Sequence, residues 1–198
     1  MQARRLATLE LNALVEGAIE GGATEIVAWV GHCNFPGCID VELLHPECKL
    51  EMNTGDAGPV CLDDTYDAIF LTGLHAKQDT QNGVLAHGLF PGLELDGETI
   101  GEIGITCAQA AHLGVPLVFI SGDRAAIAEA RRFVPNIEAV IVKERISVTR
   151  GDRWHAPTLT IAPAKARILI REGARRAMQR IGEIQLPPKP SFDPVNVD

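Results

Sequence analysis

Residues 116–144, PLVFISGDRAAIAEARRFVPNIEAVIVKE, decide the fold that the sequence predicts. The apolar run over 116–120 predicts a strand, and the run over 138–142 predicts another. Between them, Asp123 begins a helical pattern that ends near Phe133. Two strands joined through a helix are typical of a parallel pair in an α/β layered domain.

The same alternation of elements continues outward on both sides. Helical spacing of apolar residues predicts helices over 3–20, 101–113 and 163–181. Two short apolar runs, 24–30 and 67–72, predict buried strands separated by a loop-rich stretch, and Asp96-Gly97 predicts a hairpin turn within 93–100. We therefore expect a three-layer α/β fold with a largely parallel sheet flanked by helices. One domain is expected over 1–184, followed by a Pro-rich tail over 185–198.

The composition is that of an ordinary globular protein. Of 198 residues, 46% are hydrophobic, and 26 acidic against 18 basic side chains give a net charge of -8. This balance argues against nucleic acid or an anionic lipid surface as a partner, because both are bound through basic side chains. No apolar run reaches the roughly 18–20 residues of a membrane span, and the N-terminal residues lack the pattern of a secretory signal. We expect a cytoplasmic protein with no nucleic-acid and no membrane partner.

The cysteines fit the same location. Their number, five, is odd, which favours free thiols in a reducing cytoplasm over a disulfide framework. A structural zinc site of Cys33, Cys38 and Cys48 with His32 or His45 is an alternative, but structural zinc ligands usually come in close pairs. Small buried or loop cysteines are the simpler interpretation.

Two histidines follow predicted strands, at the edge where open parallel sheets bind ligands. His32 follows the first strand and His75 the second. His87 lies in the segment VLAHGLF, whose alternation predicts one buried face, and Glu102 lies in the first turn of a predicted helix. Two histidines and a carboxylate suit a catalytic zinc ion that keeps one position open for water. The alternatives are histidines bonded to loop carbonyls or satisfied in the core, and a glutamate that pairs with the helix dipole.

Other catalytic motifs are absent from the sequence or have a simpler explanation. There is no GxGxxG after the first strand, no GxxxxGK[ST], no GxSxG and no HExxH. Ser121 could serve as a nucleophile at a strand end, but Asp123 as the N-cap of a helix accounts for this turn. Arginines at roughly helical spacing between 167 and 180 predict a solvated face that pairs with Glu172 or contacts another subunit.

Four stretches together carry a family resemblance. They are ATEIVAWVGHCNFPGCIDVELLHPECKL (23–50), GLHAKQDTQNGVLAHG (73–88), DGETIGEIGITCAQAAHLGVPLVFISGDRAA (96–126) and VPNIEAVIVKE (134–144). In their order and spacing they resemble the D-aminopeptidase family of zinc-dependent, self-compartmentalising peptidases. The resemblance extends to about residue 184.

The resemblance implies a role for each candidate residue. His32 and His75 are similar to the histidine ligands of the family's zinc centre, and Glu102, in Gly-Glu-Ile-Gly, is similar to its glutamate ligand. His87 is similar to the histidine assigned as nucleophile or proton-transfer residue. Members hold two zinc ions, cleave the N-terminal residue from short D-amino-acid peptides and assemble as homodecamers.

The chain also departs from the family pattern. Members open with a strand bearing Ser-x-Asp-x-Glu-Gly, whose carboxylates bind and bridge the metals, and the chain begins near the family's first helix. Val30 stands where relatives tend to have Asp, and Cys33 stands where glycine is usual. Measured against the family, the chain is expected to be truncated at both ends. If Met1 is the true start, we expect it to bind one zinc ion or none; if the sequence is part of a longer protein, we expect the full two-zinc site in the complete protein.

The expected function is that of a metallo-aminopeptidase-like hydrolase that cleaves N-terminal D-amino acids from short peptides with a zinc-activated water. The expected partners are a short peptide substrate and further copies of the chain in a homo-oligomer. The alternative is a catalytically impaired relative that acts as an oligomeric scaffold or binding protein. A third reading is a one-metal hydrolase such as an amidase.

Overall fold

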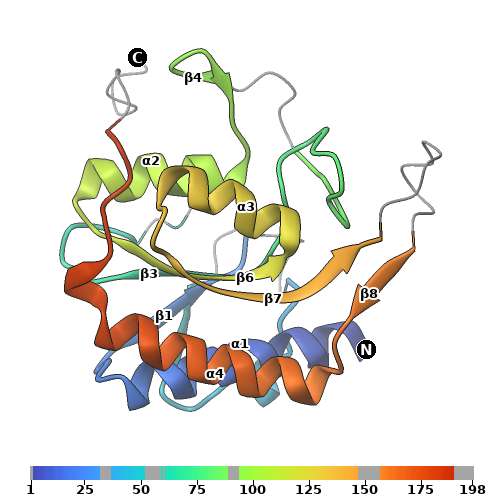
Figure 1. Ribbon diagram of the computed structural model, residues 1–198. Helices are drawn as coiled ribbons and strands as arrows, with labels where there is room; N and C mark the ends of the chain where they lie inside the picture. Colours follow the sequence, from blue (N-terminus) through green and yellow to red (C-terminus); the bar gives the residue numbers. More distant parts are fainter. Residues whose placement is uncertain are drawn as a thin grey trace. The chain divides into compact units, whose positions relative to one another are not determined.

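The computed structural model describes residues 2–31, 37–51, 59, 61–88, 94–146 and 157–189 (Figure 1). The chain divides into two compact units. The first unit contains Met1–Tyr66 and Ala162–Arg180, and the second contains Asp67–Ile161 and Ile181–Asp198. Within the described residues, no helix combines the length and the apolar character that a membrane crossing requires.

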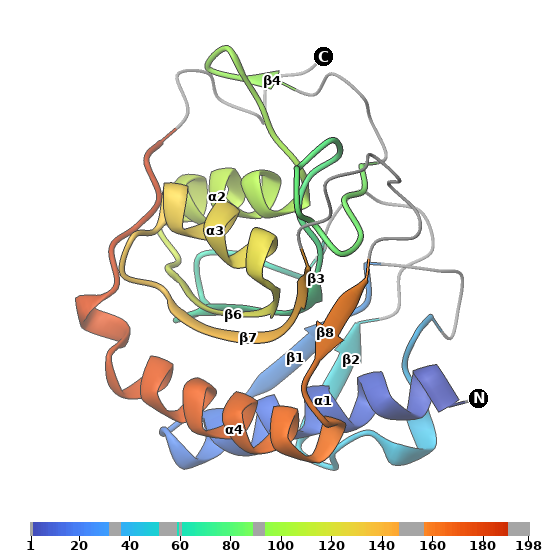
Figure 2. The same ribbon diagram turned by 45° about the vertical axis from the view of Figure 1, so that its right-hand side comes forward.

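Two helices of the first unit, α1 (Gln2–Glu20) and α4 (Pro163–Gln179), lie side by side (Figures 1 and 2). A Cβ atom at Gly17 would lie 2.1 Å from the carbonyl oxygen of Arg171, so the close approach requires a glycine there. The guanidinium of Arg171 also pairs with Glu16, at 3.0 Å, and with Glu20. One residue of the predicted arginine face thus joins two helices that are far apart in the sequence.

The first unit also holds two short parallel strands, β1 (Ile26–Trp29) and β2 (Cys48–Glu51), with the 3-10 turn η1 (Val41–Leu43) between them in sequence. The strand is found as predicted, but the prediction that it is buried is wrong, because all four residues of β1 are only half-buried; among the described strands, β1 pairs with β2 alone. Strand β2 falls in the stretch predicted as loops. The core of this part is made by buried residues of α1 and of the segments around β2: Leu11, Val15, Ile39 and Cys48.

The second unit is built on a four-stranded sheet in the order β3-β6-β7-β8. Strands β3 (Ile69–Leu74), β6 (Leu117–Asp123) and β7 (Glu138–Arg145) are parallel, and β8 (Thr158–Thr160) is antiparallel to β7. Helices α2 (Glu102–Leu113) and α3 (Arg124–Phe133) cover the same face of the parallel strands (Figure 1). Every residue of β6 is buried, since this strand has a neighbour on each side and helices above it.

The smaller features of the second unit follow local sequence signals. Strands β4 (Glu94–Leu95) and β5 (Glu98–Thr99) form the predicted hairpin, and both of its turn residues have positive φ, 52° at Asp96 and 78° at Gly97. The turn η2 (Ile181–Glu183) follows α4 in sequence. Residues 185–189 have no regular structure, and the rest of the predicted tail lies outside the described residues.

The predicted helices and the α/β class are confirmed. The largely parallel character holds in the second unit, where β8 alone among the strands of the four-stranded sheet runs antiparallel. The single-domain boundary at residue 184 stays a prediction.

Candidate metal centre

A histidine and a glutamate meet at one end of the parallel strands in the second unit. His75 follows directly after β3, and Glu102 is the first residue of α2. The Nε2 atom of His75 lies 3.6 Å from Oε2 of Glu102, and the two side chains are 12% and 24% exposed. Both predicted ligands of this unit therefore lie together, partly shielded from solvent.

Close backbone packing next to Glu102 brings the two residues together. A Cβ atom at Gly101 would lie 2.6 Å from Cβ of Lys77 and 2.9 Å from its Cα, so only glycine admits the loop after β3 at this distance. The ammonium group of Lys77 donates to the carbonyl oxygen of Thr99 at 2.9 Å. The start of α2 and the loop that carries His75 are thus fastened to each other.

The ring orientation of His75 suits metal binding. Its Nδ1 atom lies 3.1 Å from the carbonyl oxygen of Ala76. Since a carbonyl oxygen only accepts, Nδ1 carries the proton in this contact, and in the neutral ring Nε2 keeps its lone pair on the side of Glu102. A hydrogen bond from the second ring nitrogen to a backbone carbonyl is typical of histidines that bind metals.

The distance between the two side chains fits one shared ion. In tetrahedral zinc sites with metal–ligand bonds of about 2.0–2.2 Å, neighbouring ligand atoms are about 3.3–3.6 Å apart. The 3.6 Å between Nε2 of His75 and Oε2 of Glu102 meets this requirement. The described part of the chain contains no group of three or more His, Cys, Asp or Glu side chains that could hold a metal ion. The predicted third ligand, His32, lies outside the described residues.

The imidazole of His87 packs against that of His75. Their ring centroids are 5.2 Å apart and their planes are inclined by 75°. The backbone N–H of His87 donates to the carbonyl oxygen of Ala76 at 3.1 Å. The expectation of a strand with one buried face is wrong here, since His87 is exposed and makes only an isolated bridge with Lys77. An exposed imidazole beside the candidate ligands is accessible to a substrate.

Two buried carboxylates fasten the segment between the two histidines. Oε2 of Glu129, in α3, accepts from the backbone N–H of Lys77 at 2.7 Å, and Oδ2 of Asp123 accepts from that of Val84 at 2.6 Å. Burial raises the pKa of the Glu129 carboxyl above its usual value. The expected capping role of Asp123 is confirmed, because its Oδ1 accepts from Ala126 N–H at 2.7 Å.

Sequence reasoning missed the contacts of these two carboxylates with the loop. For Glu129 the sequence did carry a signal: it stands three residues after Ala126, which places a charged side chain on the apolar face of the predicted helix, where it needs a buried partner. For the contact between Asp123 and Val84, which spans 39 residues of sequence, there was none.

The structure places several of the other candidate residues that the sequence offered. Ser121 is 1% exposed, and its hydroxyl shares a hydrogen bond with that of Thr72 at 2.9 Å, so it is not presented as a nucleophile. Four cysteines, Cys38, Cys48, Cys61 and Cys107, are free thiols. His45 accepts from the N–H of Glu47 at 3.2 Å, which explains it as a turn residue. Cys33 lies outside the described residues.

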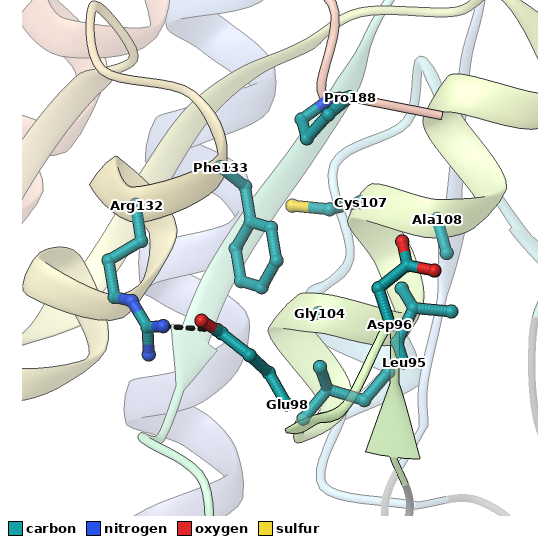
Figure 3. A pocket seen from close by; sticks show the side chains of 10 residues that line it. Leu95, Asp96, Glu98, Gly104, Cys107, Ala108, Arg132, Phe133 and Pro188 are labelled. Carbon is teal, nitrogen blue, oxygen red and sulfur yellow. Dashed lines mark hydrogen bonds and ion pairs between the residues drawn. The ribbon is translucent and has the colours of Figure 1, made fainter. Parts of the chain in front are cut away.

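A pocket of about 300 Å³ lies elsewhere in the second unit, between α2, the β4–β5 hairpin and the end of α3 (Figure 3). Arg132 and Glu98 form an ion pair at its side, and Phe133 and Leu95 supply apolar surface. Burial raises the pKa of the Cys107 thiol to about 12, so the sulfur that faces this pocket is not a nucleophile at neutral pH. None of His75, His87 and Glu102 lines it.

The fold and the histidine–glutamate pair define an α/β protein with a candidate catalytic metal site. The chain belongs to the D-aminopeptidase family (peptidase M55), whose model matches residues 1–198. This membership confirms the resemblance that the motifs carry.

Two relatives show how far the similarity extends. The chain is 30% identical over 189 residues to a D-aminopeptidase of Bacillus subtilis (strain 168), with 92% of the chain and 65% of the relative covered. It also matches a solved structure, described as the Zn-dependent D-aminopeptidase DppA from Bacillus subtilis, a self-compartmentalizing protease, with a TM-score of 0.81 and 30% identity. That match covers 94% of the chain and 68% of the DppA chain. The chain thus spans about two thirds of the length of the relatives it matches.

Proposed function

We propose that the protein is a zinc-dependent aminopeptidase that removes an N-terminal D-amino acid from short peptides. The observation that carries the proposal is the pair of His75 and Glu102, 3.6 Å apart at the strand ends of a chain that belongs to the D-aminopeptidase family. His75 and Glu102 supply two metal ligands, and His32 supplies the third.

A zinc ion bound there would act as a Lewis acid: it would polarise the carbonyl group of the peptide bond to be cleaved and lower the pKa of a bound water molecule. The hydrogen bond from Nδ1–H of His75 to the Ala76 carbonyl oxygen fixes the orientation of the imidazole, so that Nε2 is available to the zinc ion. The exposed imidazole of His87 takes up a proton and delivers it to the leaving amine. Each turnover consumes one water molecule and releases one amino acid and a peptide shortened by one residue.

The second candidate function is an oligomeric scaffold or binding protein that has lost the chemistry. It is favoured by the sequence next to the proposed ligand His32, where Val30 and Cys33 depart from the family pattern. The two candidates differ in peptide turnover, and a protein that binds no zinc also fits only the second.

We further propose that the protein forms a homo-oligomer, a decamer as in its family, and is located in the cytoplasm. The relative described as a self-compartmentalizing protease supports the first part, and the four described free thiols support the second. Light scattering coupled to gel filtration measures the subunit number.

The proposed function is tested by assaying purified protein, loaded with zinc or treated with a chelator, against D-alanyl-D-alanine, L-alanyl-L-alanine, N-acetyl-D-alanyl-D-alanine and D-alaninamide. Zinc-dependent release of D-alanine from the first substrate only, or much faster than from the others, supports the aminopeptidase. Hydrolysis of the amide alone supports a one-metal amidase. Bound zinc with no turnover on any substrate, or no zinc at all, supports the scaffold.

A further inference from the structure

The carboxylate of Asp123 makes one more contact than a helix cap needs. Asp123 ends β6 and is 3% exposed. Its Oδ1 caps α3 by accepting from Ala126 N–H at 2.7 Å, which satisfies the usual capping requirement. Its Oδ2 accepts from the backbone N–H of Val84 at 2.6 Å, in a segment 39 residues earlier in the chain. The second oxygen thus links the helix to the loop that carries His87.

The residue Glu129 makes the corresponding contact at the other end of that loop. It lies in α3, is 7% exposed, and accepts from Lys77 N–H through Oε2 at 2.7 Å. Lys77 comes two residues after His75, and Val84 comes three residues before His87. One helix and its cap therefore hold both ends of the segment 77–84, and the two histidines lie two residues before it and three residues after it.

The loop itself has little other regular support. Residues 75–88 contain no helix and no strand beyond the isolated bridge between Lys77 and His87. Asp79 and Asn82, inside the held segment, have positive φ values of 63° and 64°, which marks tight turns. Hydrogen bonds to a buried charged oxygen are stronger than those between neutral groups. The two carboxylates are therefore well suited to define where this loop lies.

We propose that Asp123 and Glu129 are positioning residues, which hold the segment 77–84 so that the imidazole of His87 stays against that of His75. The catalytic part of this inference rests on the proposed aminopeptidase function, in which His87 transfers the proton. Neither carboxylate touches the substrate in this account. Loss of either contact shifts the segment and with it His87. The Asp123 contact, at Val84, is farther along the chain from His75 than the Glu129 contact at Lys77, which also packs against Gly101 beside Glu102.

The variant Asp123→Asn separates the cap from the loop contact. Asn caps helices as well as Asp does, so its amide oxygen keeps the bond from Ala126 N–H. Its NH₂ group then faces the N–H of Val84, and two donors cannot bond each other. We expect faster amide hydrogen exchange at Val84 and His87 by NMR, unchanged exchange at Ala126, and a kcat about 10- to 100-fold lower with unchanged KM, because a displaced catalytic group costs rate.

A double-mutant cycle distinguishes positioning from a general structural effect. If Asp123 acts through His87, Asp123→Asn lowers kcat of the His87→Ala variant by less than about 2-fold, since the group to be positioned is already gone. Equal losses in both backgrounds, or unchanged exchange at Val84 and His87, overturn the proposal. If the wild-type protein shows no peptidase turnover, the proposed function fails, and the exchange measurement alone decides the positioning.

A second pair of variants keeps the test open if Asp123→Asn does not fold. The amide oxygen of Glu129→Gln still accepts from Lys77 N–H, whereas Glu129→Leu offers no acceptor. We expect faster exchange at Lys77 and a kcat about 10-fold lower or more in the Leu variant, and exchange and kcat within about 3-fold of wild type in the Gln variant. Identical behaviour of the two variants overturns the proposal.

Discussion

The imidazole of His75 and the carboxylate of Glu102 approach to 3.6 Å, although one follows a strand and the other begins a helix. The contact depends on Gly101, where a side chain would collide with Lys77. His87, whose ring lies beside that of His75, completes the constellation. The protein therefore brings a ligand pair and an accessible imidazole to one place.

Removal of either proposed ligand abolishes tight zinc binding. For His75→Ala and Glu102→Gln, we expect zinc dissociation constants at least about 100-fold higher, since even residues that only orient ligands change metal affinity by about 10- to 100-fold. Titration against a competing zinc indicator measures this. The control is His112→Ala, an exposed histidine on the same helix, which should bind zinc like wild type. Wild-type affinity in both ligand variants would exclude the pair as the site.

Gly122 in β6 allows this strand to approach closely the residue that precedes His75. A Cβ atom there would lie 2.5 Å from the carbonyl oxygen of Leu74, the residue before His75. We expect Gly122→Ala to lower the free energy of unfolding by about 1–3 kcal/mol, as overpacking does, and to weaken zinc binding. Gly182→Ala is the matched control, because a Cβ atom there meets nothing within 4 Å. Equal stability of the two variants in urea denaturation would contradict this account.

The contact between α1 and α4 depends on packing more than on charge. Gly17→Ala places a methyl group 2.1 Å from the Arg171 carbonyl oxygen, so the helices must separate. Arg171→Ala removes only exposed ion pairs with Glu16 and Glu20, which salt screens. We expect Gly17→Ala to lower the melting temperature clearly more than Arg171→Ala does. The reverse order would show that the ion pairs dominate.

The buried thiol of Cys107 makes stability depend on alkaline pH. Burial raises its pKa from 9.0 to about 12, so in the folded protein the thiol keeps its proton up to a higher pH than it does in the unfolded chain. Its contribution is fully present below pH 9 and is lost as pH rises toward 12. Relative to Cys107→Ala, the wild type should lose roughly 1 kcal/mol of unfolding free energy by pH 10. Parallel stability curves for the two proteins between pH 8 and 10 would contradict the assignment.

Much of the fold could be predicted, because its elements follow local patterns. The helix of α3, its Asp123 cap and the Asp96-Gly97 turn each depend on a few neighbouring residues. The strands β2 and β8 could not be found in this way. Their residues, CKLE and TLT, alternate between apolar and polar side chains, but over four and three residues this pattern is too short to separate a strand from a loop. They are strands because a neighbouring strand pairs with each of them.

The candidate site could be predicted in its residues and not in its geometry. His75 and Glu102 each stand at the end of a predictable element, so strand-end reasoning identified them. The alternation around His87 suggested a strand with one buried face. The backbone there is instead held by hydrogen bonds from Val84 N–H to the Asp123 carboxylate and from His87 N–H to the Ala76 carbonyl oxygen. Such contacts join residues that are far apart in the sequence, and no local pattern encodes them.

The measurement that tests the central claim most directly is X-ray diffraction from zinc-soaked crystals, recorded on both sides of the zinc absorption edge. We predict an anomalous peak about 2.0–2.2 Å from both Nε2 of His75 and a carboxylate oxygen of Glu102, with His32 as a further ligand. A zinc peak bound by other residues, or none at a zinc concentration that supports turnover, would contradict the account.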